Sequence, residues 1–278
     1  MQDIQSPGQT PPGQTPFGAT APAPPRSGLL AGSWAARSPW PGLSATAVTV
    51  LIVLAGMGVA VGVFVLLALA GISYMPEIEA PESSWPGGGR ALLTWLGVAQ
   101  TAMIALTWLV SGLRGGRRSE VLALGPPAGG PRAYLTGLAI LAVVLAIYNL
   151  VLYALIGHDM LADLRPFKEM VNGPGWWLAL LVIGLGAPLS EELLFRGFLQ
   201  TALAHTRFGF FGAAIITTAM WTALHAGYSA SGLVEVFLVG LVMCLLLWRT
   251  GSLRVTLVCH GVYNTALLLF LWAFGHLV

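Results

Sequence analysis

Charged residues are scarce in this sequence: only 9% of its 278 residues are Asp, Glu, Lys or Arg. Soluble domains average about 25% charged residues. Hydrophobic residues make up 56% of the chain, and the mean hydropathy is +0.79. So few charges cannot cover a water-facing surface without leaving large apolar patches. The composition therefore argues against a soluble enzyme and a disordered regulator, and we predict a polytopic membrane protein.

Cysteine and net basic charge are scarce as well. Cys244 and Cys259 lie inside apolar runs, so neither a disulfide framework nor a cysteine metal site is indicated. A formal charge of +2 is too small for binding to phosphate backbones, and we expect no nucleic-acid partner. One lysine stands against twelve arginines, with abundant Ala, Gly and Pro. This usage favours a GC-rich bacterium, and hence the bacterial plasma membrane.

Residues 1–43 contain the tandem repeat PGQTP-PGQTP and almost no aliphatic side chains. Such a segment cannot bury enough apolar surface to offset its chain entropy, so we predict a disordered cytoplasmic tail. It lacks the pattern of a signal peptide. A proline-rich ligand for a partner domain is the alternative. The rest divides into N-terminal transmembrane helices over 44–157 and a membrane core over 158–278, which holds the motifs described below.

Seven apolar runs follow the tail. A helix needs about 20 apolar residues to cross the hydrocarbon core, and most of the runs reach that length. Backbone groups inside lipid must be paired within the segment, so the runs must be helices and the fold class is an all-α bundle. The runs are Ala47–Gly71, Leu92–Leu113, Tyr134–Leu155, Trp176–Leu199, Phe210–Tyr228, Leu233–Trp248 and Val255–Phe274.

Basic residues are distributed unevenly between the two sides of these spans. With the amino terminus inside, ten arginines fall on that side, whereas Arg90, Arg165 and Lys168 fall on the other. Positive charge marks the cytoplasmic side of a membrane protein. We therefore expect a cytoplasmic N-terminus, and seven spans would place the C-terminus outside.

The fourth run carries charges that a membrane helix normally avoids. Only fifteen residues, Trp176–Ser190, precede Glu191 and Glu192, so both carboxylates lie within the membrane zone. Each ionised group there costs about 2.5–3.5 kcal/mol and marks a functional site by default. Glu192 and Arg196 are four residues apart on one helix face, which favours an ion pair. Glu191 lies about 100° away around the helix and is left as the free carboxylate.

A purely structural role is the alternative for these charges. Glu191, Glu192 and Arg196 could form one cluster that only holds the helices of the bundle together. Upstream, Pro188 cannot donate a backbone hydrogen bond, so we expect a kink that frees the carbonyl of Gly184 and opens room beside Glu191.

Two later runs each present a histidine on the same face as a second side chain. Trp221 and His225 are four residues apart, as are His260 and Asn264. A single histidine in a membrane most often bridges helices. Together with Glu191, however, these groups supply a base, a second proton-transfer group and donors for an oxyanion, which amide hydrolysis requires. The sequence offers no rival nucleophile, so water would attack.

The three motifs resemble those of the CAAX-protease and bacteriocin-processing (CPBP, or Abi) family of intramembrane proteases. Glu191 to Gly197 is similar to its EExxxR motif, Trp221 to His225 to its FxxxH motif, and His260 to Asn264 to its HxxxN motif. The resemblance covers about residues 176–270. Trp221 departs from the usual Phe, which puts the size of the substrate in question.

That resemblance implies an enzyme with a four-helix catalytic core. Glu191 and His225 would activate water, and His260 and Asn264 would stabilise the oxyanion. Glu192, Arg196 and Trp221 would support the site. The predicted activity is endopeptidase cleavage of a membrane-proximal peptide, leader-type or lipid-modified. No cofactor is expected, although Glu191, His225 and His260 could also hold Zn²⁺ with an open position for water.

Other functions use the same residues. A non-enzymatic membrane adaptor or self-immunity protein would need them only to hold the bundle. A proton- or cation-coupled carrier is a third candidate, but no inverted repeat of broken helices is visible. A shared catalytic site requires His225 and His260 to lie at similar depths in the membrane, and the spacing does not provide this directly. His225 follows Arg207 by eighteen residues, about 27 Å of helix, whereas His260 follows Arg254 by six residues, about 9 Å.

Overall fold

The computed structural model describes residues 32–72, 88–172 and 176–278, and these residues form helices and no strand. Six helices are long and apolar enough to cross a bilayer, which confirms the predicted polytopic helical bundle. The helices are α1 (Gly42–Leu69), α2 (Gly88–Ser111), α4 (Arg132–Ile156), the composite helix Trp176–Ala204, α10 (Ala230–Thr250) and α11 (Leu253–Phe274).

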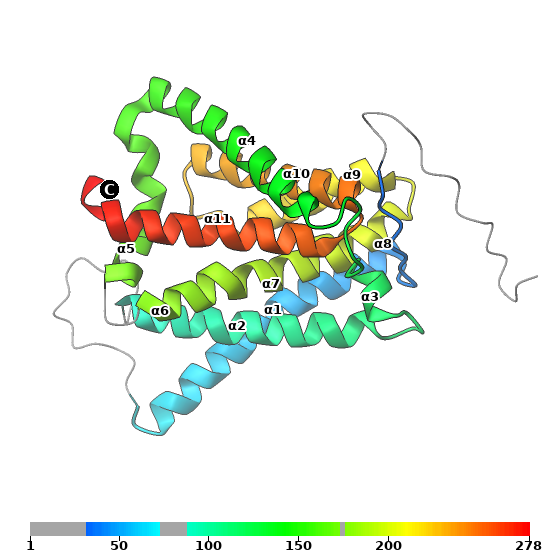
Figure 1. Ribbon diagram of the computed structural model, residues 1–278. Helices are drawn as coiled ribbons and strands as arrows, with labels where there is room; N and C mark the ends of the chain where they lie inside the picture. The colour runs from blue at the N-terminus through cyan, green and yellow to red at the C-terminus, as the bar shows by residue number, and fades with distance from the viewer. Residues whose placement is uncertain (1–31, 73–87, 173–175) are drawn as a thin grey trace, which may run out of the picture. The chain divides into compact units, whose positions relative to one another are not determined.

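The fifth predicted span is shorter than expected. α9 (Gly209–Ala223) has 15 residues, about 22 Å of helix, so six of the seven predicted spans have full length among the described residues. The shorter α9 still runs from the α8 end back toward the start of α10 (Figure 1). The chain leaves the helix before Gly227 and turns. Ser229 then begins α10 by accepting a hydrogen bond from the backbone of Gly232.

The composite helix contains both α-helical and π-helical segments: α6 (Trp176–Ala179), η2 (Leu180–Gly186), α7 (Ala187–Glu191), η3 (Glu192–Leu199) and α8 (Gln200–Ala204), of which η2 and η3 are π-helical. It lies against α2 and α11 (Figure 1). π-helical turns are rare and occur often at functional sites. Glu191 and Glu192 stand where α7 passes into η3.

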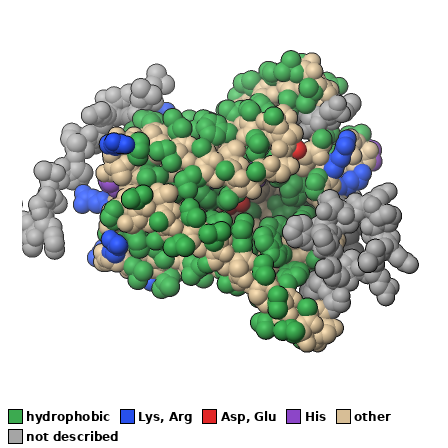
Figure 2. Space-filling model, turned by 180° about the vertical axis from the view of Figure 1, so that it is seen from behind, with side chains coloured by type: hydrophobic (Ala, Val, Ile, Leu, Met, Phe, Trp, Pro, Cys, Tyr) green, Lys and Arg blue, Asp and Glu red, His purple; other side chains and the backbone are tan. Residues whose placement is uncertain are grey.

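The core of the bundle surrounds the second half of this composite helix. All residues of η3 are buried, and side chains from α9, α10 and α11 pack around them. By contrast, α4 and the last nine residues of α1 present mostly exposed apolar side chains. A lipid-facing helix surface has this character. The face in Figure 2 is largely hydrophobic, with Lys and Arg side chains gathered toward its two ends.

A segment within the predicted tail packs on the bundle. The backbone N–H groups of Ser33 and Trp34 donate to the carbonyl of Trp248, and the Trp34 ring lies 5.0 Å from that of Phe210. The described chain therefore joins the bundle from Gly32, before the predicted boundary at residue 43, because its tryptophans find aromatic partners. Residues 1–31 of the predicted tail lie outside the described residues.

Short elements cover the two ends of the bundle. α3 (Arg118–Val121) lies near the Gly32–Pro41 segment, whereas η1 (Gly157–Leu164) and α5 (Arg165–Asn172) lie at the other end, which also holds the C-terminal turn η4 (Gly275–Leu277) (Figure 1). At that end Asp163 accepts hydrogen bonds from the backbone and hydroxyl of Ser229, at 2.9 and 2.6 Å. These bonds fix the start of α10 and the turn that precedes it.

Candidate active site

Glu192 joins the first motif to the third. Its Oε1 lies 3.2 Å from a guanidinium nitrogen of Arg196 and 3.0 Å from Nδ1 of His260. The Glu192 and Arg196 side chains are 0% exposed, so the ion pair predicted from their spacing is present and wholly buried. An ionised carboxylate only accepts hydrogen bonds. Nδ1 of His260 must therefore carry the proton, which leaves Nε2 to face the rest of the site.

Glu191 points away from that pair. Its Oε2 accepts a hydrogen bond of 2.6 Å from the indole nitrogen of Trp221 and lies 3.9 Å from Nε2 of His260. The side chain remains 18% exposed, so this carboxylate is reached from outside whereas Glu192 is not. Two adjacent glutamates of one helix thus have separate environments.

Trp221 lies at the centre of the cluster. The Arg196 guanidinium stands 4.1 Å from the centre of its ring. The rings of His225 and His260 approach edge-on, at centroid distances of 5.1 and 5.6 Å. α10 comes close here because Gly240 has no side chain: a Cβ would lie 2.9 Å from Arg196 and 3.1 Å from Trp221. One tryptophan therefore contacts groups from all three motifs.

His225 lies in the turn just after α9. Its Nδ1 is 3.1 Å from the carbonyl oxygen of Trp221. A carbonyl oxygen can only accept, so Nδ1 carries the proton and Nε2 is the free base. Trp221 connects His225 to the third motif, because its ring contacts both His225 and His260. The structure brings His225 beside Trp221, while Glu191 has its direct histidine contact with His260.

Asn264 lies on α11 and faces η2. Its amide nitrogen donates to the carbonyl of Ile183 at 2.9 Å. In η2 the backbone pairs each carbonyl with the N–H five residues on, as Ala187 does with Val182. Pro188 would be the donor to Ile183 and has no N–H. The carbonyl freed by Pro188 is thus that of Ile183 and not of Gly184, because the register is π-helical, and Asn264 satisfies it.

The candidate zinc ligands do not form a metal site as they stand. Within residues 32–72, 88–172 and 176–278, no three His, Cys, Asp or Glu side chains are placed to hold a metal ion. Nδ1 of His260 is bonded to Glu192 and Nδ1 of His225 faces a carbonyl, so each ring keeps Nε2 free.

Sequence reasoning missed a polar group that adjoins this cluster. The ring of Tyr228 lies 5.4 Å from that of His225. Burial, and then the carboxylates of Glu191, Asp163 and Glu235, raise the pKa of Tyr228 above its ordinary 10.0, so the hydroxyl stays neutral and able to donate. The spacing of His225 and Tyr228, three residues apart, was the available signal.

Glu235 on α10 is a further acid in the bundle, and it bridges two helices. Its Oε1 accepts a hydrogen bond of 2.9 Å from the hydroxyl of Tyr263, which ties α10 to α11. Tyr263 precedes Asn264, so this bridge supports the helix that carries the third motif.

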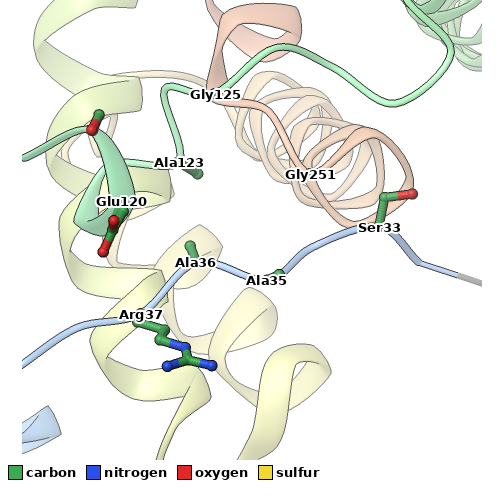
Figure 3. A pocket seen from close by; sticks show the side chains of 9 residues that line it. Ser33, Ala35, Ala36, Arg37, Glu120, Ala123, Gly125 and Gly251 are labelled. Atoms are coloured by element: carbon green, nitrogen blue, oxygen red, sulfur yellow. The ribbon is translucent and has the colours of Figure 1, made fainter. Parts of the chain in front are cut away.

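Two hollows lie away from the cluster. Figure 3 shows one of about 380 Å³ at the end where the Gly32–Pro41 segment crosses the chain near Ala123 and Gly251. The second, of about 530 Å³, is an apolar groove between α1, α2 and the start of the composite helix. Neither is lined by a residue of the three motifs. The candidate site is therefore defined by the contacts among its side chains and not by either of these hollows.

Comparison with known families identifies the segment that holds these side chains. Residues 173–266 match a family model described as type II CAAX prenyl endopeptidase Rce1-like. The segment is similar to this family. The match spans all three motifs, from Glu191 to Asn264, and confirms the resemblance that they predicted.

The chain is also similar to a bacterial protein. An Escherichia coli protein described as "Uncharacterized 24.3 kDa protein" is 36% identical over 122 residues, which is 42% of this chain and 56% of the relative. The chain thus spans little more than half the length of that protein. No solved structure matches the chain.

Proposed function

We propose that this protein is an intramembrane endopeptidase that hydrolyses a peptide bond of a membrane-proximal peptide. The observation that carries the proposal is the position of Glu191, whose carboxylate lies 3.9 Å from Nε2 of His260 inside an apolar helical bundle. The match to the Rce1-like family supports the same reaction class. Glu191 is the partly exposed base for water, and the fixed His260 ring beside it is placed to donate to the oxyanion.

In the proposed reaction, Glu191 and His225 activate the water. Glu191 takes a proton from a water molecule, and the hydroxide forms a bond to the carbonyl carbon of the scissile amide. Nε2 of His225 is unprotonated at the start, so it first takes up the proton that water gave to Glu191, and it then passes that proton to the amide nitrogen. The carbon–nitrogen bond then breaks, and the products are a carboxylate and an amine.

The negative charge on the carbonyl oxygen needs donors that are in place before the reaction begins. A protonated His260 donates from Nε2, because Glu192 fixes the ring through Nδ1. Asn264 has one N–H on the Ile183 carbonyl, so the oxyanion would take its second N–H. In a site with little water these donors stabilise the intermediate more strongly than they would in solution.

We propose a glutamate mechanism without a metal ion. The donor geometry supports it, since the described side chains include no three-ligand group. The substrate class that we propose is a peptide held at the membrane, either leader-type or lipid-modified. An apolar exterior around a polar centre favours a substrate that is itself anchored in lipid.

The test uses the full chain in detergent with two internally quenched peptides, one farnesylated at a C-terminal cysteine and one of leader type. We expect Glu191→Gln, His225→Ala and His260→Ala each to lower kcat at least 100-fold. His276→Ala, an exposed residue at the C-terminal turn, is the control and should match wild type. Cleavage that survives Glu191→Gln undiminished contradicts the proposal.

The alternative is a membrane adaptor or self-immunity protein in which these residues are structural. The complete burial of the Glu192–Arg196 pair is the observation that favours it. In that case the three substitutions would lower thermal stability together and no peptide would be cleaved by wild type. Retained stability with lost cleavage separates the enzyme from the adaptor.

A further inference from the structure

Trp221 makes a hydrogen bond that the phenylalanine expected at this motif position could not make. Its indole N–H lies 2.6 Å from Oε2 of Glu191. We propose that Trp221 is a positioning residue, which holds one oxygen of the Glu191 carboxylate and leaves the other to take a proton from water. This inference rests on the proposed function, because it assigns Glu191 the role of base.

The indole is fixed in place on several sides. It is 2% exposed, and the guanidinium of Arg196, which lies in η3, is 4.1 Å from the ring centre. α10 packs so closely that even a methyl group at Gly240 would lie 3.1 Å from the ring. A ring held this tightly cannot turn its N–H away from Glu191. The donor is therefore oriented before any substrate arrives.

The choice of oxygen matters for the chemistry. Oε2, which accepts the indole N–H, is also the oxygen nearest to Nε2 of His260. A hydrogen bond to an ionised group is about twice as strong as one between neutral groups. Trp221 thus restricts the carboxylate to one rotamer, with Oε2 between the indole and His260. Oε1 is left as the oxygen for water.

Trp40 supplies a matched control within the same chain. It also has a guanidinium over its ring, that of Arg114 at 4.5 Å, and an edge-on phenylalanine, Phe198 at 5.5 Å. Its indole nitrogen is buried and has no hydrogen-bond partner among the described residues. Replacing either tryptophan by phenylalanine keeps a ring under an arginine. Only the change at position 221 removes a hydrogen bond to Glu191.

The first test compares Trp221→Phe with Trp40→Phe in the peptide-cleavage assay. We expect Trp221→Phe to lower kcat about tenfold with KM within twofold of wild type, since the substitution misplaces the base without touching bound peptide. Trp40→Phe should keep both constants. Equal kcat for Trp221→Phe and wild type, while Glu191→Gln is inactive, overturns the inference and leaves the proposed function standing.

The second test needs no catalytic activity. Selective ¹⁵N labelling of tryptophan in detergent gives one indole N–H signal per residue, and the signal absent from Trp221→Phe belongs to Trp221. We expect Glu191→Ala to move that signal upfield and to leave the Trp40 signal unchanged. An unmoved Trp221 signal overturns the inference. If the Trp221 signal moves in Glu191→Ala but the wild-type protein cleaves neither peptide, the hydrogen bond stands and the proposed function is refuted.

Discussion

Oε1 of Glu192 lies 3.0 Å from Nδ1 of His260, although 68 residues separate the two in the chain. The same oxygen lies 3.2 Å from Arg196. One carboxylate therefore neutralises a buried guanidinium and orients a histidine of another helix. The first and third motifs act as one unit, and a change at Glu192 is expected to affect both stability and chemistry.

Glu192→Gln should separate these two effects when combined with a second substitution. The single variant leaves Arg196 buried without a counter-charge, which costs about 3–5 kcal/mol of stability. The double variant Glu192→Gln/Arg196→Gln removes that charge, so most of the thermal stability should return. Cleavage should stay low in both, because neither holds His260 through an ionised carboxylate. Recovery of cleavage in the double variant would mean that Glu192 serves only to neutralise Arg196.

Gly240→Ala should disturb the site from outside it. The added methyl group would lie 2.6 Å from Thr218, 2.9 Å from Arg196 and 3.1 Å from Trp221. Such overpacking costs about 1–3 kcal/mol and should lower both the melting temperature and kcat. Gly58→Ala on α1 is the control, since nothing lies within 4 Å of the new methyl group. Equal melting temperatures for the two variants would contradict the close packing of α10.

Removal of divalent metal should leave cleavage unchanged. Protein purified without added metal should contain well under one zinc ion per chain, and prolonged dialysis against a chelator should keep kcat within twofold. Elemental analysis and the peptide assay measure the two quantities. Stoichiometric zinc together with chelator-sensitive turnover would overturn the glutamate mechanism.

The predicted orientation can be checked with introduced cysteines. Ser119 in α3 and His276 in η4 are exposed and lie at opposite ends of the bundle (Figure 1). The native Cys244 and Cys259 are buried and should give no background. In intact cells an impermeant thiol reagent should label His276→Cys, and Ser119→Cys only after permeabilisation. The reverse pattern would place the N-terminus outside.

Much of the candidate site follows from local spacing. The pair Glu192–Arg196 lies four residues apart along one helix, and the structure contains it as an ion pair. The separate position of Glu191 follows from the same geometry. These features needed no knowledge of the fold, because a helix places neighbouring residues by its own repeat.

The hydrogen bonds that link different motifs could not be predicted from the spacing of residues along one helix. The spacing of Trp221 and His225 indicates one face, but not that the indole donates to Glu191, 30 residues earlier. An α-helical register assigned the free carbonyl to Gly184, whereas the π-helical turn shifts it to Ile183 and gives Asn264 its partner. The apolar run Phe210–Tyr228 looked long enough to span and instead ends as a helix at Ala223.

By itself, the sequence determined that this is a helical membrane protein with ionisable groups in its Rce1-like segment. Composition and periodicity are local properties, and lipid leaves the backbone no other choice than helices. The tertiary structure decided which atoms meet: Glu191 with Trp221, Glu192 with His260, and Asn264 with Ile183. Those contacts depend on helix register, helix length and the closeness of packing at Gly240, which no single segment encodes.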